Sequence, residues 1–186
     1  MEFQTWKTIK LGTGLRTAND FKIALNTAGC RLGWYGTDTI LNSPTFTVST
    51  SEIEVELVNV SIAQLKHSHS DYEWCEDGDV RFDEIYERAR SLNLGICPAE
   101  VGPQLRLQYL DQPQKNDTDE EIAGKADFDL HIGMEPVIIN NNPTQEREFG
   151  IFYLNHSNSG LYLATTQANA ADSHCGFLRF VFIKRK

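Results

Sequence analysis

The sequence has few basic residues and no long apolar run, and each shortage excludes a class of protein. Its 17 lysines and arginines stand against 26 aspartates and glutamates, which gives a net charge of −9. This charge disfavours binding to nucleic acids or anionic membranes, because their phosphates would be repelled. No apolar run approaches the ~18 residues that span a bilayer, and residues 1–7 lack the basic and then apolar layout of a secretory signal. We therefore expect a soluble cytoplasmic protein that does not enter membranes.

Closely spaced cysteines are also missing. The four cysteines, Cys30, Cys75, Cys97 and Cys175, form no CxxC pair, so neither a structural zinc site nor a thioredoxin-like motif is indicated. Free thiols are the simplest expectation for a cytoplasmic protein. Because the number of cysteines is even, two disulfides would be possible if the protein were exported.

What is present is the composition of a globular domain. The 186 residues are 40% hydrophobic, 10% aromatic and 23% charged, unlike a disordered or fibrous chain. A chain of this length buries roughly two thirds of the surface that it exposes when unfolded. We expect one domain over residues 1–186.

Two helices are indicated by apolar residues at helical spacing. The first follows Thr17 and Asp20, which form a variant capping box, and it ends near Gly29. The second covers residues 82–92, with Gly95 as its expected stop. A short helix within residues 34–41 is a weaker prediction, because glycines and threonines interrupt it.

The remaining chain reads mainly as strands, because its residues alternate between apolar and polar or are β-branched and aromatic. We expect strands at residues 45–48, 53–62, 104–110, 128–132, 137–139, 149–154, 161–165 and 177–183. Residues 156–160 have the composition of a hairpin turn, and residues 111–127 form a polar stretch long enough to be a loop. The predicted fold is therefore α+β, with two or three helices packed on a largely antiparallel sheet.

The segment HSHSDYEWC, residues 67–75, resembles the first part of the metallo-β-lactamase motif HxHxDH. His67, His69 and Asp71 match that motif, but Tyr72 replaces its third histidine. Alternating histidines on an extended segment point to one side and would share a zinc ion, yet a catalytic zinc needs a third protein ligand. The alternative is a polar connection between a strand and a helix, which we favour.

The segment 104–109 alternates regularly and is the preferred candidate for ligand binding. If it is a strand, Gln104, Arg106 and Gln108 lie on one face. Two amides flanking a guanidinium would grip a carboxylate, a phosphate or a sugar. A strand face exposed to solvent is the competing interpretation.

Two further groups are candidates for catalysis. Cys97 would be a nucleophile if the fold brought it near His131, His156 or His174, although a small buried thiol is the commoner role.

Glu100 and Glu135 would form a glycosidase-like carboxylate pair if their carboxyl groups lay ~5 to 10 Å apart. The step at Glu135 and Pro136 is equally compatible with an ordinary break in a strand.

The segment LGICPAEVGPQLRLQY, residues 94–109, resembles a family of bacterial hypothetical proteins that carry LCPAEVGPQLRLQY-like segments. The similarity extends to WKTIKLGTGLRTANDF at residues 6–21, IGMEP at 132–136, GLYL at 160–163 and RFVF at 179–182. The resemblance implies that most of the chain is one unit and that the connection at residues 67–75 is short and variable. It implies no substrate and no catalytic residue.

These observations favour a domain that binds a small molecule or another protein through Gln104, Arg106 and Gln108. One alternative is a hydrolase that uses Cys97 with a histidine, or Glu100 with Glu135. Another is a metal-dependent enzyme centred on His67 and His69. No cofactor is expected, and zinc remains the open alternative.

Overall fold

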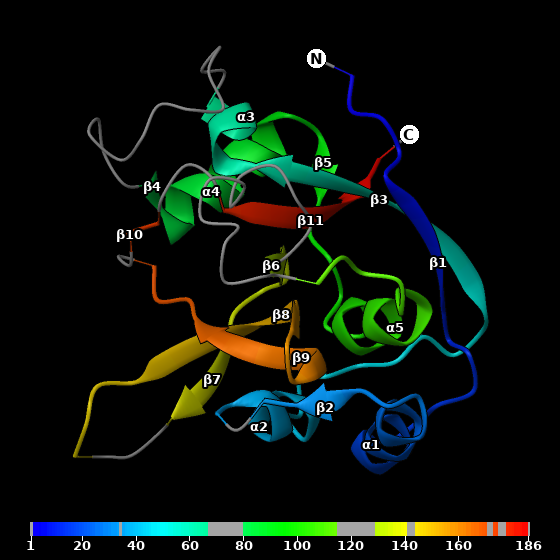
Figure 1. Cartoon of the computed structure of the whole chain (residues 1–186). Coiled ribbons are helices and arrows are strands. Elements are labelled where there is room, and N and C mark those ends of the chain that lie inside the picture. Colours follow the sequence, from blue (N-terminus) through cyan, green and yellow to red (C-terminus); the bar gives the residue numbers. More distant parts are fainter. Residues whose placement is uncertain are drawn as a thin grey trace.

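The computed structural model describes residues 2–33, 35–66, 80–114, 129–140, 144–170, 173–174 and 178–185. The described residues form five helices. They are α1 (Ala18–Thr27), α2 (Thr37–Leu41), α3 (Ile62–Lys66), α4 (Phe82–Ser91) and α5 (Val101–Gln108). Figure 1 shows them around a large sheet.

The strands follow each other in a different order in the sheet from that in the chain. They are β1 (Lys7–Leu11), β2 (Arg31–Leu32), β3 (Ile53–Ser61), β4 (Val80–Arg81), β5 (Leu94–Gly95), β6 (Asp129–Ile132), β7 (Val137–Asn140), β8 (Glu148–Ser157), β9 (Gly160–Gln167), β10 (Ser173–His174) and β11 (Arg179–Lys184). Nine of them form one sheet in the order β1-β3-β11-β6-β8-β9-β2, with β5 beside β11 and β7 beside β8. The strand β11 therefore joins the last residues of the chain to its first half.

The described sheet is mixed. Most neighbouring strands are antiparallel, but β11 runs parallel to β6 and β2 runs parallel to β9. The α+β class is confirmed, whereas the expected two or three helices are too few. The predicted hairpin turn is confirmed, since β8 and β9 pair up to Ser157 and Gly160.

Local signals place the two predicted helices correctly. The Thr17 side chain accepts from the Asp20 amide, and the Asp20 side chain accepts from the Thr17 amide, which completes the predicted capping box of α1. Gly29 follows α1 with a φ of 76°, a conformation that glycine adopts without strain. At the end of α4 the left-handed position is taken by Asn93, with a φ of 60°, and the predicted stop Gly95 belongs to β5.

The strand predicted at residues 104–110 is wrong, because residues 101–108 form the helix α5. This helix contacts β1 at one end of the strand order and β8 and β9 toward the other end. The sheet must therefore curl around α5 (Figure 1). The helix is enclosed, and Val101 and Leu105 are fully buried in it.

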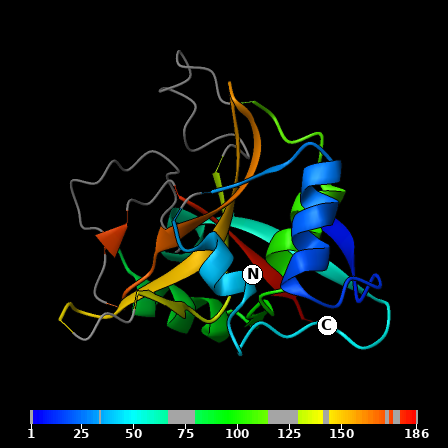
Figure 2. The ribbon, with the colours of Figure 1, turned by 90° about the horizontal axis from the view of Figure 1, so that it is seen from below.

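Two further helices complete the inner side of the curl. α1 packs against α5, and Figure 2 shows the two side by side. α2 contacts β7, β8 and β9. Residues 45–48, expected as a strand, form no regular element, and Phe46 instead packs edge-on against Phe21 of α1, with ring centroids 5.5 Å apart.

The outer face of the sheet is covered at β11 by α4. Phe82 and Tyr86 of α4 pack edge-on against Phe180 and Phe182, with centroids 5.8 and 6.3 Å apart. Phe180 is also the cross-strand neighbour of His131 in β6, so the aromatic contacts of α4 continue across β11 to that histidine. None of the helices in the described ranges combines the length and apolar character needed to cross a membrane.

Candidate functional site

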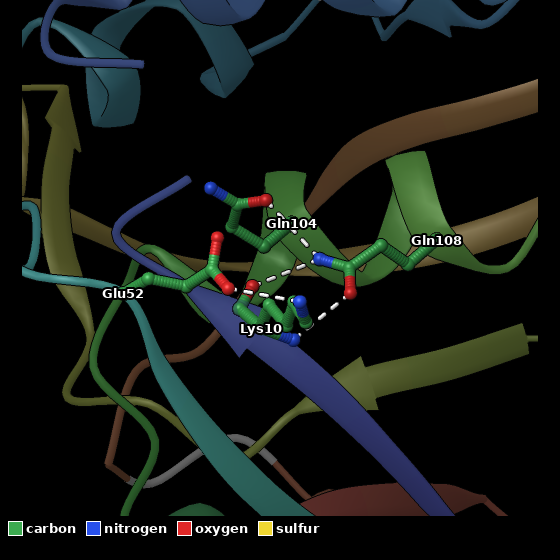
Figure 3. A network of polar contacts seen from close by, with 4 residues as sticks. All are labelled: Lys10, Glu52, Gln104 and Gln108. Carbon is green, nitrogen blue, oxygen red and sulfur yellow. Dashed lines mark hydrogen bonds and ion pairs between the residues drawn. The ribbon is translucent and has the colours of Figure 1, made fainter. Parts of the chain in front are cut away.

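The amides predicted to bind a ligand are bound to the protein itself. Gln104 and Gln108 lie one turn apart on α5, and the Gln108 amide donates to the Gln104 side-chain oxygen over 3.2 Å. The Gln108 oxygen also accepts from the Lys10 backbone amide at 2.9 Å, and its nitrogen donates to the Lys10 carbonyl at 2.8 Å (Figure 3). Since β1 ends the strand order, this side chain supplies the bonds that a further strand would make. A ligand would have to displace β1 to reach these amides.

Glu100 lies at the start of α5 and is fully buried. One carboxylate oxygen accepts from the Gly12 amide at 2.7 Å and from Gln104 at 3.2 Å, and the other accepts from the Ser49 amide at 2.8 Å. The side chain thus fastens two loops to α5. A buried carboxyl group requires such donors, because an unpaired one is costly to desolvate.

Arg106 points to a different environment from the two glutamines. Its guanidinium is fully buried and donates to the Tyr109 carbonyl and to the Gln112 side chain. It therefore holds the C-terminal end of α5, where carbonyl groups lack helical partners. The predicted row of Gln104, Arg106 and Gln108 on one face is wrong, because a helix distributes alternate residues around its axis.

The structure does not bring Glu135 to Glu100. Glu135 is exposed and pairs with Arg90 of α4 at 2.8 Å, whereas Glu100 is buried beside α5. α4 and α5 lie on opposite faces of the sheet, so the two carboxylates are held by different elements on different sides. This arrangement gives no support to a carboxylate pair across one glycosidic bond.

Cys97 is buried, and its thiol donates to the Val181 carbonyl at 3.4 Å. Burial raises the pKa of this thiol, so that it stays protonated at neutral pH. Among the three candidate histidines, His131 stacks between aromatic rings and His156 contacts the Gln112 carbonyl at 2.6 Å. The His174 side chain lies outside the described part of the structure.

The metal candidates His67, His69 and Asp71 also lie outside the described residues. Within the described ranges, no three histidine, cysteine, aspartate or glutamate side chains gather so as to hold a metal ion.

A different group of polar side chains gathers on the outer face of the sheet, beyond the part covered by α4. Residues directly opposite each other on neighbouring strands point to the same face. The strand register therefore creates two adjacent rows across β2, β9, β8, β6 and β11. The first row contains Arg31, Tyr162, Asn155 and Asp129. The second row contains Ala164, Tyr153, His131 and Phe180.

Side chains within the first row are linked to each other. The Arg31 guanidinium lies 6.0 Å from the centre of the Tyr162 ring and donates to its hydroxyl at 3.3 Å. The Asn155 amide donates to the Asp129 carboxylate. These contacts orient a guanidinium, a phenol, an amide and a carboxylate along one line.

The second row connects the aromatic core to this polar surface. His131 stacks between Tyr153 and Phe180, with centroids 5.6 and 5.3 Å apart. Its Nδ1 lies 3.3 Å from the Arg179 carbonyl, and because a carbonyl only accepts, we assign the hydrogen to Nδ1. The predicted candidate His131 therefore lies at this surface, but as part of an aromatic stack.

Two adjoining hollows of about 390 and 420 Å³ lie over these rows. Both are lined by Tyr153 and Asn155; Tyr35 and Tyr162 line one, and Asp129 and His131 line the other. Their sizes fall in the range of ligand pockets, roughly 300 to 1,000 Å³.

Two small residues lie in close contact at the first hollow. Gly33 lies against Ala164 so closely that a Cβ atom at position 33 would be 2.7 Å from the Ala164 Cβ. Both residues line the hollow. A side chain at position 33 would collide with Ala164 of β9, so glycine allows the segment before α2 to pack closely on the sheet.

Tyr153 is the best candidate for a hydrogen bond to a ligand. Its side chain is half-buried, and within the described ranges its hydroxyl forms no hydrogen bond. Burial and, secondly, the charge of Asp129 raise the pKa of the Tyr153 phenol, so that it remains a hydrogen-bond donor at neutral pH. The sequence carries a signal for this site, since Tyr153, Asn155 and Ser157 alternate with apolar Phe152 and Leu154.

Comparison of the chain with models of protein families, with curated proteins and with solved structures finds no match.

Proposed function

We propose that the chain binds a small polar ligand in the two adjoining hollows on the outer face of β6, β8 and β9. The observation that carries this proposal is the convergence of Tyr153, Asn155 and Asp129 on a concave surface that α4 leaves uncovered. Aromatic rings with a few oriented polar groups are typical of small-molecule sites. A concave surface of this size suits a small molecule better than the flat surface of a protein partner.

The polar groups of the site support binding. Burial keeps the Tyr153 phenol protonated by raising its pKa, so that it donates a hydrogen bond, and the Asn155 side-chain oxygen accepts one. The thiol and carboxylate candidates Cys97, Glu100 and Glu135 lie elsewhere, in separate contacts. Binding is therefore the function that this surface supports best.

The experiment is a ligand screen on the ¹⁵N-labelled full chain, followed by amide chemical shifts. We expect fragments that bind to shift the amides of β6, β8 and β9. Tyr153→Phe and Asn155→Ala should weaken binding, whereas Tyr109→Phe, which removes a phenol hydroxyl outside the hollows, should not. Shifts confined to other parts of the chain would contradict the proposal.

A further inference from the structure

The lining of the hollows limits the chemistry of the ligand, and this deduction rests on the proposed function. The first restriction is charge. The Asp129 carboxylate lines one hollow. Tyr35, which lines the other, donates its hydroxyl hydrogen to the Glu148 carboxylate. The one guanidinium in the row, that of Arg31, is placed on the Tyr162 ring. The net charge of −9 and the Asp129 carboxylate in the lining disfavour phosphorylated and other anionic ligands.

The second restriction is the pattern of hydrogen-bonding groups. Asn155 uses its amide nitrogen to donate to Asp129, and its side-chain oxygen is an acceptor. The neighbouring Tyr153 hydroxyl both donates and accepts. As the two residues are separated by two positions on one strand, their Cα atoms are about 7 Å apart. A ligand with several hydroxyl groups around one ring matches this mixture of acceptors and donors.

The third restriction comes from the aromatic lining of the site. Tyrosine rings supply the aromatic lining of the first hollow, from Tyr35, Tyr153 and Tyr162. A sugar ring packs its apolar C–H groups on tyrosine rings while its outer hydroxyls remain hydrated.

We infer that the hollows take a neutral carbohydrate, which packs against Tyr153 and Tyr162 and bonds through its hydroxyls to Asn155 and the Tyr153 phenol. Tyr35, in the segment before α2, lines the same hollow, and so do Gly33 and Ala164, which lie in close contact with each other.

The test uses the full chain with three sets of probes. The first set contains methyl glycosides of glucose, galactose, mannose and N-acetylglucosamine and their disaccharides. The second contains adenosine and indole, and the third contains glucose 6-phosphate. Saturation-transfer NMR detects binding, and amide shifts locate it. We expect at least one neutral sugar to bind at β6, β8 and β9, and glucose 6-phosphate to bind more weakly than glucose.

Single variants then test the contacts. Tyr153→Phe keeps the ring but removes its hydroxyl, and should weaken sugar binding about three- to tenfold, as should Asn155→Ala. Tyr162→Ala should weaken it about tenfold or more through loss of the ring. Tyr109→Phe should leave the affinity unchanged, and amide spectra will show whether each variant is folded.

The outcomes separate this inference from the proposed function. If only adenosine, indole or glucose 6-phosphate shifts the amides of these strands, the carbohydrate inference is wrong while the binding site stands. If no probe and no fragment shifts them, both are wrong. Sugar binding that Tyr153→Phe, Asn155→Ala and Tyr162→Ala all leave unchanged also overturns the inference.

Discussion

At the scale of single residues, Glu100 shows how a charged residue type can be placed inside a protein. Three donors surround its carboxyl group, two from the backbone amides of Gly12 and Ser49 and one from Gln104. These donors, from two loops and a helix, take the place of the water molecules that would hydrate an exposed carboxylate. Its role in the structure is therefore to join segments that are distant in the sequence.

This role predicts a large effect of a small change. Glu100→Gln replaces one acceptor oxygen with an NH₂ group, so that one backbone amide faces another donor. We expect the free energy of unfolding to fall by about 1 to 3 kcal/mol, measured from urea denaturation. Glu54→Gln makes the same change at an exposed position of β3 and should have little effect. Equal urea midpoints for the two variants would refute this role.

Cys97 predicts a dependence of stability on alkaline pH. Burial raises the pKa of its thiol in the folded state, whereas a thiol in the unfolded chain ionises near about pH 8.5. Above that pH the unfolded state loses a proton that the folded state retains, so the free energy of unfolding falls as pH rises. The contribution reaches at most about 1.4 kcal/mol per pH unit.

The measurement is urea denaturation between pH 7 and 10 for the wild-type chain and for Cys97→Ala. We expect the stability of the variant to fall less steeply above about pH 8.5. Its lower stability at neutral pH, caused by the lost side chain, does not affect the comparison of slopes. Parallel curves would show that the thiol ionises equally in both states.

At the scale of elements, α5 protects the edge of the sheet. Gln108 bonds to both the amide and the carbonyl of Lys10, and it thereby occupies backbone groups that would otherwise be open to pairing with another chain. The Lys10 side chain turns away to Glu52, at 2.8 Å. Figure 3 shows both interactions around β1.

Removal of the Gln108 side-chain amide should expose the backbone groups of Lys10 at the edge strand β1. For Gln108→Ala we expect the backbone amide of Lys10 to exchange hydrogen about tenfold faster or more, because its acceptor is lost. Gln114→Ala is the matched control, since Gln114 bonds to Asn158 rather than to β1. Hydrogen exchange followed by NMR provides the measurement, and an unchanged rate at Lys10 would contradict the assigned role of Gln108.

The contrast between α1 and α5 explains which elements could be predicted. α1 carries its boundary signals within a few residues, in the Thr17 capping box and Gly29. α5 is enclosed by the curled sheet, so that polar Gln104 and Arg106 are as buried as Leu105. The alternation of polar and apolar residues in α5 therefore does not indicate which face is exposed. Its period of two residues is typical of a strand, so a strand was predicted.

At the scale of the whole molecule, the sheet can curl around α5 because the two approach closely at Gly102. A Cβ atom at this position would lie 2.5 Å from Cδ2 of Phe152 in β8. Phe152 is itself fully buried. The contact joins the helix to the sheet in the centre of the protein.

In Gly102→Ala, overpacking should lower the free energy of unfolding by about 1 to 3 kcal/mol. The higher helix propensity of alanine should offset about 1 kcal/mol of this loss. Phe152→Leu creates room at the same contact. The double variant should therefore be more stable than the sum of the single effects implies, by about 0.5 to 3 kcal/mol. Urea denaturation of the four proteins completes this cycle, and strict additivity would show that Gly102 and Phe152 do not constrain each other.

The sequence by itself determined the features that depend on neighbouring residues. These include the capping box of α1, the helical spacing of α4, the hairpin between β8 and β9, and the acidic net charge. Only the tertiary structure decided that the Gln108 amide would bind Lys10 and that Tyr153 and Asn155 would line a hollow. The physical reason is that the environment of a polar side chain depends on what covers its face, and here those covering elements come from distant parts of the chain.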